Sequence, residues 1–142
     1  MEFIEAAPGD PRLGEIYPVM HELRTEMSED QFNEIYAEGH PIGYRVVGLF
    51  DDGACRATAG YHLTHMFLHG RILYVDDLIT LASERSKGYG KAMNDYLIAV
   101  ARSAGCSTIQ LDSGSFRHDA HRFYFREGYV ITSFHFSQDL DD

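Results

Sequence analysis

The sequence predicts an α/β (α+β) fold with a mixed central sheet of about six to seven strands and about four flanking helices. Three observations lead to this prediction. Strand-like and helix-like patterns alternate along the chain, and the apolar run at 71–81 is followed by a helical pattern at 91–104. Gly105 then separates that helix from a short apolar run at 107–112. A strand, a helix and a strand in this order form a right-handed crossover, so the two strands should be parallel.

The first forty residues predict one strand and two helices. Residues 2–6 read as a strand. Asp10-Pro11 is a helix start, with Asp as the N-cap and Pro in the first turn. Ser28 and Gln31 form a capping box that opens a second helix, and residues 39–41 (Gly-His-Pro) end it.

The middle of the chain predicts an antiparallel meander. Strands are expected at 43–50, 54–66 and 71–81, joined by the turns Asp51-Asp52-Gly53 and His69-Gly70. A last helix is expected at 117–127. Two closing strands should follow it, at residues 129–131 and 134–140, and we expect residues 1–142 to form a single domain.

Composition excludes several classes of protein. Hydrophobic residues make up 44% of the 142, aromatic residues 13% and charged residues 24%, which is ordinary for a soluble domain. No apolar run approaches the roughly 20 residues that span a bilayer. No basic and then apolar leader opens the chain, so we expect a cytoplasmic protein that does not bind membranes.

The net charge of −10 argues against a nucleic-acid partner, which requires basic patches, and favours the approach of a cationic substrate. Cys55 and Cys106 show no metal or redox spacing. His118 and His121 share a helix face, but no acidic or cysteine partner is evident near them. We therefore expect no bound metal.

A glycine loop at residues 85–92 lies between the predicted strand and helix. Glycine backbone and the positive end of a helix dipole together favour phosphate. Two common phosphate loops are excluded. Arg85 stands at the first glycine of a P-loop and Ala92 at its hydroxyl position, while Met93 replaces the third glycine of the dinucleotide fingerprint. An ordinary glycine turn before a helix is the alternative.

Two motifs resemble the GCN5-related N-acetyltransferases (GNAT). The pattern Arg-x-x-Gly-x-Gly at 85–90 resembles the family's coenzyme A pyrophosphate loop. Residues 120–129 (Ala-His-Arg-Phe-Tyr-Phe-Arg-Glu-Gly-Tyr) resemble its late helix, and they follow in the family's order. The two motifs and their connecting elements cover residues 72–140, and the first half of the chain matches in element order only.

The resemblance implies a site for acetyl-CoA. In the family, pantetheine pairs with the exposed backbone of the strand before the loop, and the N–H of Leu78 would polarise the acetyl carbonyl. The pyrophosphate would meet backbone N–H groups of the loop. Arg117 stands where many relatives have a coenzyme-contacting Asn, which is a departure from the family pattern. The expected coenzyme-binding residues are Leu78, Ile79, Thr80, Arg85, Ser86, Lys87, Gly88, Tyr89, Gly90 and Lys91.

Asp76 and Asp77 are the candidates for deprotonating the acceptor amine. They lie inside an apolar strand, where charge is costly unless satisfied. Strand alternation would put Asp77 with Val75 and Ile79 on one face and Asp76 on the other. The segment resembles that of spermidine/spermine acetyltransferases, whose first acid, the proposed base, maps to Asp76. The alternative is that one Asp caps a loop or pairs with an Arg.

Tyr124 matches the tyrosine that the family proposes as general acid to the departing thiolate, and a core tyrosine is the alternative. The resemblance implies an acetyl-CoA-dependent N-acetyltransferase, an acyltransferase acting on a small amine or a protein lysine. A non-catalytic acyl-CoA-binding sensor or regulatory domain is the rival class. A homodimer is compatible with the fold, although no feature of the sequence specifies one.

Overall fold

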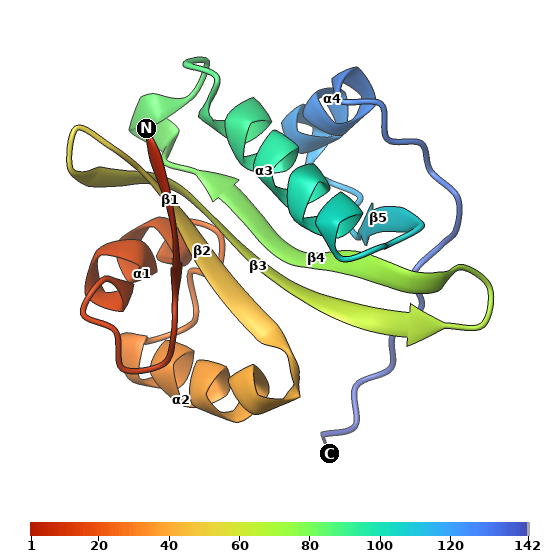
Figure 1. The fold of residues 1–142 in the computed structure, drawn as a ribbon, viewed down its shortest axis with the longest axis horizontal. Helices are drawn as coiled ribbons and strands as arrows, with labels where there is room; N and C mark the ends of the chain where they lie inside the picture. Colours follow the sequence, from red (N-terminus) through yellow and green to blue (C-terminus); the bar gives the residue numbers. More distant parts are fainter. Residues whose placement is uncertain (142) are drawn as a thin grey trace. The chain divides into compact units, whose positions relative to one another are not determined.

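The computed structural model describes residues 1–141 and falls into two compact units, Met1 to Leu111 and a second that begins at Asp112. Figure 1 shows their helices and strands. The first unit contains β1 (Glu2–Ala6), α1 (Leu13–His21), α2 (Glu29–Gly39), the 3₁₀ turn η1 (His40–Ile42), β2 (Tyr44–Asp51), β3 (Ala54–Met66), β4 (Gly70–Thr80), the 3₁₀ turn η2 (Ala82–Glu84), α3 (Tyr89–Ser103) and β5 (Thr108–Leu111). The second unit contains α4 (His118–Arg126).

The sheet has five strands in the order β1-β2-β3-β4-β5. The first four pair antiparallel, and β5 pairs parallel to β4 through residues Ile72–Val75 and Thr108–Leu111. Helix α3 connects these parallel strands, as the sequence predicts. The mixed sheet thus agrees with the predicted fold class, with fewer strands.

Helices cover both faces of the sheet. In Figure 1, α1 and α2 lie on one side of β2–β4 and α3 lies on the other. One apolar cluster joins the α1–α2 side to the sheet through Ile16, Met20, Phe32, Val46 and Ile79. A second joins α3 to the opposite face through Met93, Leu97, Leu49, Leu73 and Val75.

Local sequence signals account for several element boundaries. The hydroxyl of Ser28 accepts a hydrogen bond from the Gln31 N–H at 3.1 Å, and the Gln31 side chain accepts one from the Ser28 N–H at 2.9 Å, which completes the capping box. Asp52 and Gly53 have φ values of 53° and 75°, as a tight hairpin turn requires. Asp10 instead accepts from the Arg12 N–H at 2.8 Å, in the turn before α1 begins at Leu13.

The two closing strands predicted at residues 129–131 and 134–140 are not formed within residues 1–141, which lowers the strand count to five. Their apolar side chains are exposed, with Phe134 at 82% and Phe136 at 91%. Alternating hydrophobicity shows that a segment has an apolar face. It does not supply the partner strand that forms a ladder. The prediction was wrong because residues 129–141 pair with no strand of the described chain.

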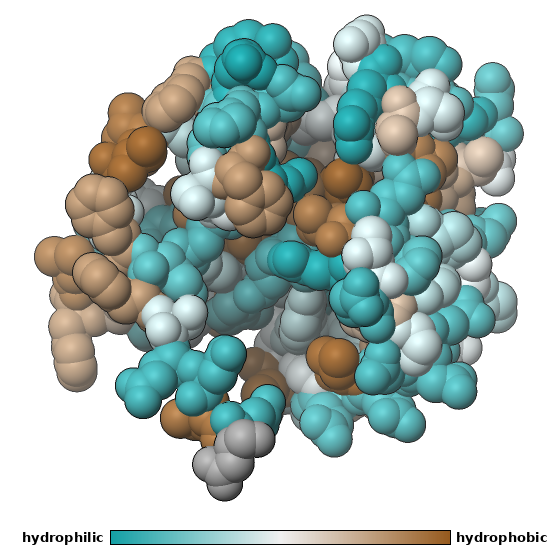
Figure 2. Space-filling view, turned by 180° about the vertical axis from the view of Figure 1, so that it is seen from behind, coloured by the Kyte–Doolittle hydropathy of each residue, from teal (hydrophilic) through white to brown (hydrophobic). Residues whose placement is uncertain are grey.

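Other apolar side chains are exposed at the tip of the β3–β4 hairpin, where Phe67 and Leu68 stand clear of the sheet. In Figure 2 hydrophobic colours gather toward the left edge, on the side where this hairpin ends. Every helix in residues 1–141 falls short of the length or the hydropathy needed to span a lipid bilayer.

Candidate functional site

Strand β4 carries a β-bulge at Asp76. Val75 pairs with Tyr61 and Asp77 pairs with Gly60, so β4 has one more residue than β3 at this point. The extra residue reverses the alternation beyond it. Val75 packs in the α3 cluster, whereas Ile79 packs in the α1–α2 cluster, although an uninterrupted strand would put residues four positions apart on the same face. The predicted grouping of Asp77 with Val75 is therefore wrong, and its grouping with Ile79 is right.

Asp77 is fully engaged by two partners on the α1–α2 side. Its side chain is only 9% exposed. One carboxylate oxygen, Oδ1, accepts a hydrogen bond from Nε of Arg24 at 2.7 Å, and Oδ2 accepts one from the Tyr44 hydroxyl at 2.5 Å. Burial, followed by the charge of Asp77, raises the pKa of Tyr44 far above its usual value, so this hydroxyl remains a donor. These contacts match the alternative in which one Asp pairs with an Arg.

Asp76 faces the same side and contacts His62 on β3. Oδ2 of Asp76 lies 2.7 Å from Nδ1 of His62. His62 is the direct cross-strand partner of Tyr44, which contacts Asp77, so the two carboxylates share a face. Both members of the pair remain accessible, with side-chain exposures of 27% for Asp76 and 35% for His62. Burial raises the pKa of Asp76, and the hydrogen bond from His62 opposes that rise.

The sequence reasoning missed His62, although a signal for it was present. Counting the register back from the β3–β4 turn pairs Gly70 with Met66 and Tyr74 with His62. Asp76 is then the diagonal neighbour of His62, two residues beyond its partner. The carbonyl of Asp76 accepts a hydrogen bond from Nη2 of Arg24 at 3.0 Å, which satisfies a backbone group at the bulge.

A cavity of about 610 Å³ opens beside Asp77, between the α1–α2 segment and the sheet. Its polar wall includes Asp77, Tyr44 and Arg24, and Glu26 lies at the same cavity. Its apolar wall is formed by Met20, Leu23, Met27, Phe32, Ile35, Tyr36 and Val46. The shape and lining suit a small molecule that combines an apolar body with a polar group.

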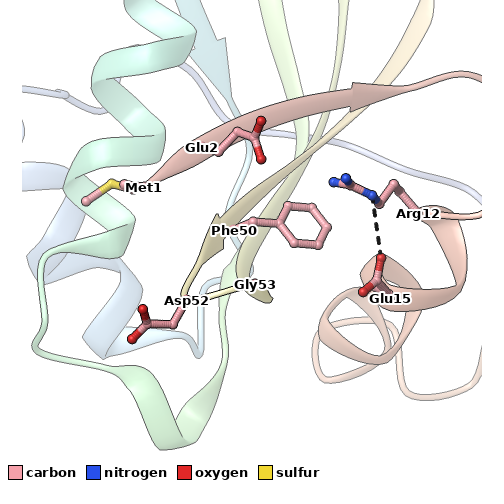
Figure 3. A pocket seen from close by; sticks show the side chains of 7 residues that line it. All are labelled: Met1, Glu2, Arg12, Glu15, Phe50, Asp52 and Gly53. Carbon is pink, nitrogen blue, oxygen red and sulfur yellow. Dashed lines mark ion pairs between the residues drawn. The ribbon is translucent and has the colours of Figure 1, made fainter.

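A second cavity, of about 310 Å³, lies near the β2–β3 turn and contains none of the predicted site residues. Figure 3 shows Arg12 joined to Glu15 on one side of it, with Phe50 and Asp52 across from them. The guanidinium Nε of Arg12 lies 3.8 Å from Glu15, and the group covers the ring of Phe50 at 5.3 Å. Because these groups already satisfy one another, this cavity is a weaker candidate.

The edge of β4 becomes free just where the bulge occurs. Pairing with β5 ends at Val75 and Leu111. Beyond Val75, the three predicted pantetheine-binding residues pair with β3 only: Leu78 with Ala59, Ile79 with Thr58 and Thr80 with Ala57. Their other edge meets no strand within the described chain. An extended ligand can hydrogen-bond to such an edge.

The loop before α3 has the backbone that an anion site requires. Ser86 has φ 67° and Gly88 has φ 86°, both left-handed, and these values sharply turn the chain into α3. Gly88 is the N-cap residue of α3, and no side chain caps the start of this helix. The N–H groups of Tyr89 and Gly90, in the first turn of α3, are among those that a helix does not pair internally.

Side chains of this loop are held by protein partners. Nζ of Lys87 lies 2.6 Å from Glu84, which also accepts a hydrogen bond from Arg56 at 2.9 Å. The hydroxyl of Tyr89 donates to Asp51 at 2.7 Å. The Arg85 side chain is exposed. The loop therefore presents backbone together with the exposed side chains of Arg85, Lys87 and Lys91.

Tyr124 lies on α4 in the second unit. Burial raises its pKa, and the charge and hydrogen bond of Arg117 oppose that rise. Its ring packs 5.5 Å from Phe123 and 5.6 Å from Tyr129, centroid to centroid. On the same helix His121 contacts the Gly114 carbonyl at 2.8 Å through Nε2, so that nitrogen is already engaged.

The sequence profile of the acetyltransferase (GNAT) family matches residues 9–129. The chain belongs to the GNAT acetyltransferase family. It is 42% identical over 125 residues to an uncharacterized N-acetyltransferase, YhdJ, of Bacillus subtilis (strain 168), covering 86% of this chain and 87% of that protein. It is also 35% identical over 80 residues to the aminoalkylphosphonate N-acetyltransferase of Salmonella typhimurium (strain LT2), covering 56% of this chain and 50% of that one.

Solved structures confirm the GNAT fold. An aminoglycoside N-acetyltransferase in complex with CoA superimposes with a TM-score of 0.82 at 15% identity, covering 99% of this chain and 95% of that one. The GNAT framework is thus an α/β fold with a mixed five-stranded sheet and four helices.

Within the first unit of this GNAT chain, the structure brings Asp76, Asp77 and Leu78–Thr80 together on one stretch of β4, with residues 85–91 following at the start of α3. At the bulge, two carboxylates lie next to a strand edge that pairs with no other strand of the described chain. This combination can bind an extended thioester and accept a proton beside it.

Proposed function

We propose that this GNAT acetyltransferase moves an acetyl group from acetyl-CoA directly to a primary amine. The observation that carries the proposal is the bulge in β4, which puts Asp76 next to the unpaired edge of residues 78–80. The amine nitrogen bonds to the thioester carbonyl carbon and loses a proton, the carbon–sulfur bond breaks, and the thiolate takes up a proton. No metal takes part.

Coenzyme binding is assigned to the β4 edge and the loop. The pantetheine arm pairs with the backbone of Leu78, Ile79 and Thr80, and the Leu78 N–H polarises the acetyl carbonyl. The pyrophosphate binds the backbone N–H groups at residues 86–91, where the left-handed conformations and the helix dipole favour an anion. Arg85, whose side chain is exposed, adds a positive charge.

The acceptor enters the cavity beside Asp77. Its apolar lining and volume of about 610 Å³ favour a small-molecule amine over a protein lysine. The Salmonella relative is named for an aminoalkylphosphonate, which is also a small amine. At neutral pH such an amine, with an ordinary pKa near 10, is mostly protonated and must lose a proton before it attacks.

Proton transfer is assigned to the Asp76–His62 pair and to Tyr124. Asp76 and His62 are partly accessible and hydrogen-bonded to each other, so the pair can accept a proton from the amine. The raised pKa of Tyr124 keeps its hydroxyl protonated, as a donor to the thiolate must be. The contacts of Asp77 with Arg24 and Tyr44 favour a structural role for that residue.

One experiment separates this activity from an acyl-CoA sensor that does not react. Acetyl-CoA binding is measured by calorimetry, and thiol release is followed with a panel of small primary amines and lysine peptides. Binding with amine-dependent thiol release supports the enzyme. Tight binding without release from any amine favours the sensor. We further propose that the protein is cytoplasmic and that residues 1–142 form a single domain. A homodimer is compatible with the fold, and measuring the molecular mass in solution tests for it.

A further inference from the structure

We propose that His62 is the group that takes the proton from the acceptor amine, and that Asp76 is the positioning residue that holds its imidazole. The inference rests on the proposed function and concerns the same reaction. It changes the role of Asp76, which then acts through His62.

The geometry of the pair leads to this assignment. Nδ1 of His62 lies 2.7 Å from Oδ2 of Asp76. In a neutral imidazole only one ring nitrogen carries a proton, and the contact with a carboxylate selects Nδ1 as that nitrogen. The lone pair is then on Nε2, which has no protein partner in residues 1–141, and the side chain is 35% exposed. A base must have a free lone pair and must be accessible to the amine. Nε2 carries a free lone pair, and the His62 side chain is accessible.

The neighbouring acid is a poorer candidate. Both carboxylate oxygens of Asp77 are taken by Arg24 and Tyr44 in a nearly closed environment. Asp76 has one oxygen committed to His62. An ordinary Asp has a pKa near 3.9 and an ordinary His one near 6.5, so the imidazole is better matched to proton transfer at neutral pH.

The charges around His62 favour the protonated imidazole that forms during the reaction. Asp76 and Tyr74 face it from β4, the Tyr74 ring at 5.5 Å, and Tyr44 is opposite it on β2. Asp77 and Arg24 lie beyond Tyr44 as an ion pair. Since the charge of Asp77 is balanced, Asp76 is the acid whose charge is left to stabilise an imidazolium.

The step balances without further reactants. The amine nitrogen bonds to the carbonyl carbon of acetyl-CoA, and its proton moves to Nε2 of His62. The carbon–sulfur bond then breaks, and the thiolate takes a proton from Tyr124 or from water. His62 returns its proton to solvent before the next cycle. The products are an N-acetylated amine and free coenzyme A.

The decisive variant is His62→Asn. The Asn amide nitrogen occupies nearly the position of Nδ1 and keeps a donor to Asp76, while the base at Nε2 is gone. The kcat/KM for the amine should fall about 10²-fold or more, with acetyl-CoA affinity unchanged by calorimetry. The acidic limb of the kcat profile should be lost in H62N. In D76N the acidic limb should persist, because His62 is still present, while kcat falls because its imidazole is no longer held in place.

His65→Gln is the matched control, because His65 lies on the same strand but on the other face and is exposed. H65Q should match the wild type in rate and pH profile. The double variant H62N/D76N should lose little more than H62N alone if Asp76 acts through His62.

Two outcomes would overturn the inference. A folded H62N with wild-type turnover and an unchanged acidic limb would return the base role to Asp76 and leave the proposed function standing. A wild-type protein that binds acetyl-CoA but acetylates no amine would remove the proposed function and the base together. Thermal unfolding of each variant confirms that the comparison is made on folded protein.

Discussion

The hydroxyl of Tyr44 and the carboxylate of Asp77 meet at 2.5 Å across an intervening strand. Tyr44 belongs to β2 and Asp77 to β4, and Gly60 of β3 lies between them. An added Cβ at Gly60 would stand 2.6 Å from Oδ2 of Asp77 and 2.9 Å from the Tyr44 hydroxyl. The missing side chain is what allows two non-adjacent strands to share a hydrogen bond.

Gly60→Ala should therefore destabilise the protein, because the methyl group displaces Asp77 or Tyr44 in a closed site. We expect a loss of about 1–3 kcal/mol in the free energy of unfolding, measured by urea denaturation. Gly14→Ala is the control, since nothing lies within 4 Å of a Cβ there and the residue is helical. It should be neutral or stabilising. Equal effects of both substitutions would contradict the steric argument.

Asp77→Ala tests the structural role of that carboxylate. It leaves the Tyr44 hydroxyl without its acceptor and Arg24 without its partner, and should lower the free energy of unfolding by about 1–3 kcal/mol. The folded D77A protein should still transfer the acetyl group. This activity is measured well below the melting temperature of the variant. A stable D77A that has lost turnover would instead give Asp77 a direct part in the chemistry.

Asp76→Asn should change how stability depends on pH. Because burial raises the pKa of Asp76, the folded protein holds this proton at pH values where the unfolded chain has released it. The contribution of Asp76 to stability therefore falls as pH rises from the ordinary pKa of Asp to the raised pKa of Asp76 in the folded protein, and the difference between D76N and wild type should move in favour of D76N over that window.

Asp51→Asn should change the pH dependence of stability in the opposite direction. The hydrogen bond from Tyr89 lowers the pKa of Asp51, so its contribution is present above the ordinary Asp value and lost as pH falls through the lowered one. Urea denaturation at several pH values measures the free energy of unfolding of D76N, D51N and the wild type. Parallel slopes for the two variants would contradict the assigned environments.

Gly90→Val tests the coenzyme loop. A branched side chain at the second residue of α3 should obstruct the approach of the pyrophosphate and weaken acetyl-CoA binding by more than about tenfold in calorimetry. Gly14→Val is the matched control, at the second residue of α1 and away from the loop. Unchanged affinity in a folded G90V would remove the loop from the coenzyme site.

Tyr124→Phe removes the proposed proton donor while keeping the ring and its packing against Tyr129. Acetyl-CoA affinity should remain close to wild type. Single-turnover transfer should slow by about 10²-fold or more, because this measurement isolates the chemical step from product release. Undiminished single-turnover transfer would make Tyr124 a packing residue.

The fold could be predicted well where the signals are local. The capping box of Ser28 and Gln31, the left-handed turn at Asp52-Gly53 and the crossover through α3 all depend on residues near one another in sequence. The closing strands could not be predicted from residues 129–140, because a strand depends on a partner that its own pattern does not reveal.

The site was predicted in part for a similar reason. The positions of Asp76 and Asp77 on β4 follow from the apolar run around them, but the bulge at Asp76 depends on the register with β3. No residue in the run marks it. The distant contacts of Arg24 and His62 with these two acids therefore lay beyond a reading of one strand.

The bulge also makes β4 sensitive to length in a way that substitution does not probe. Deleting Asp76 would remove one carboxylate together with the extra residue, and Asp77 would then follow Val75 directly in an uninterrupted pleat. Asp77 would still pair with Gly60 and stay on the α1–α2 face, and Leu78 would stay on the α3 face, so this deletion removes the contact with His62 without turning the rest of the strand over. Comparison of this strand with a sequence that lacks the bulge must therefore place a gap at Asp76, since omitting that gap would match every later side chain with the wrong face.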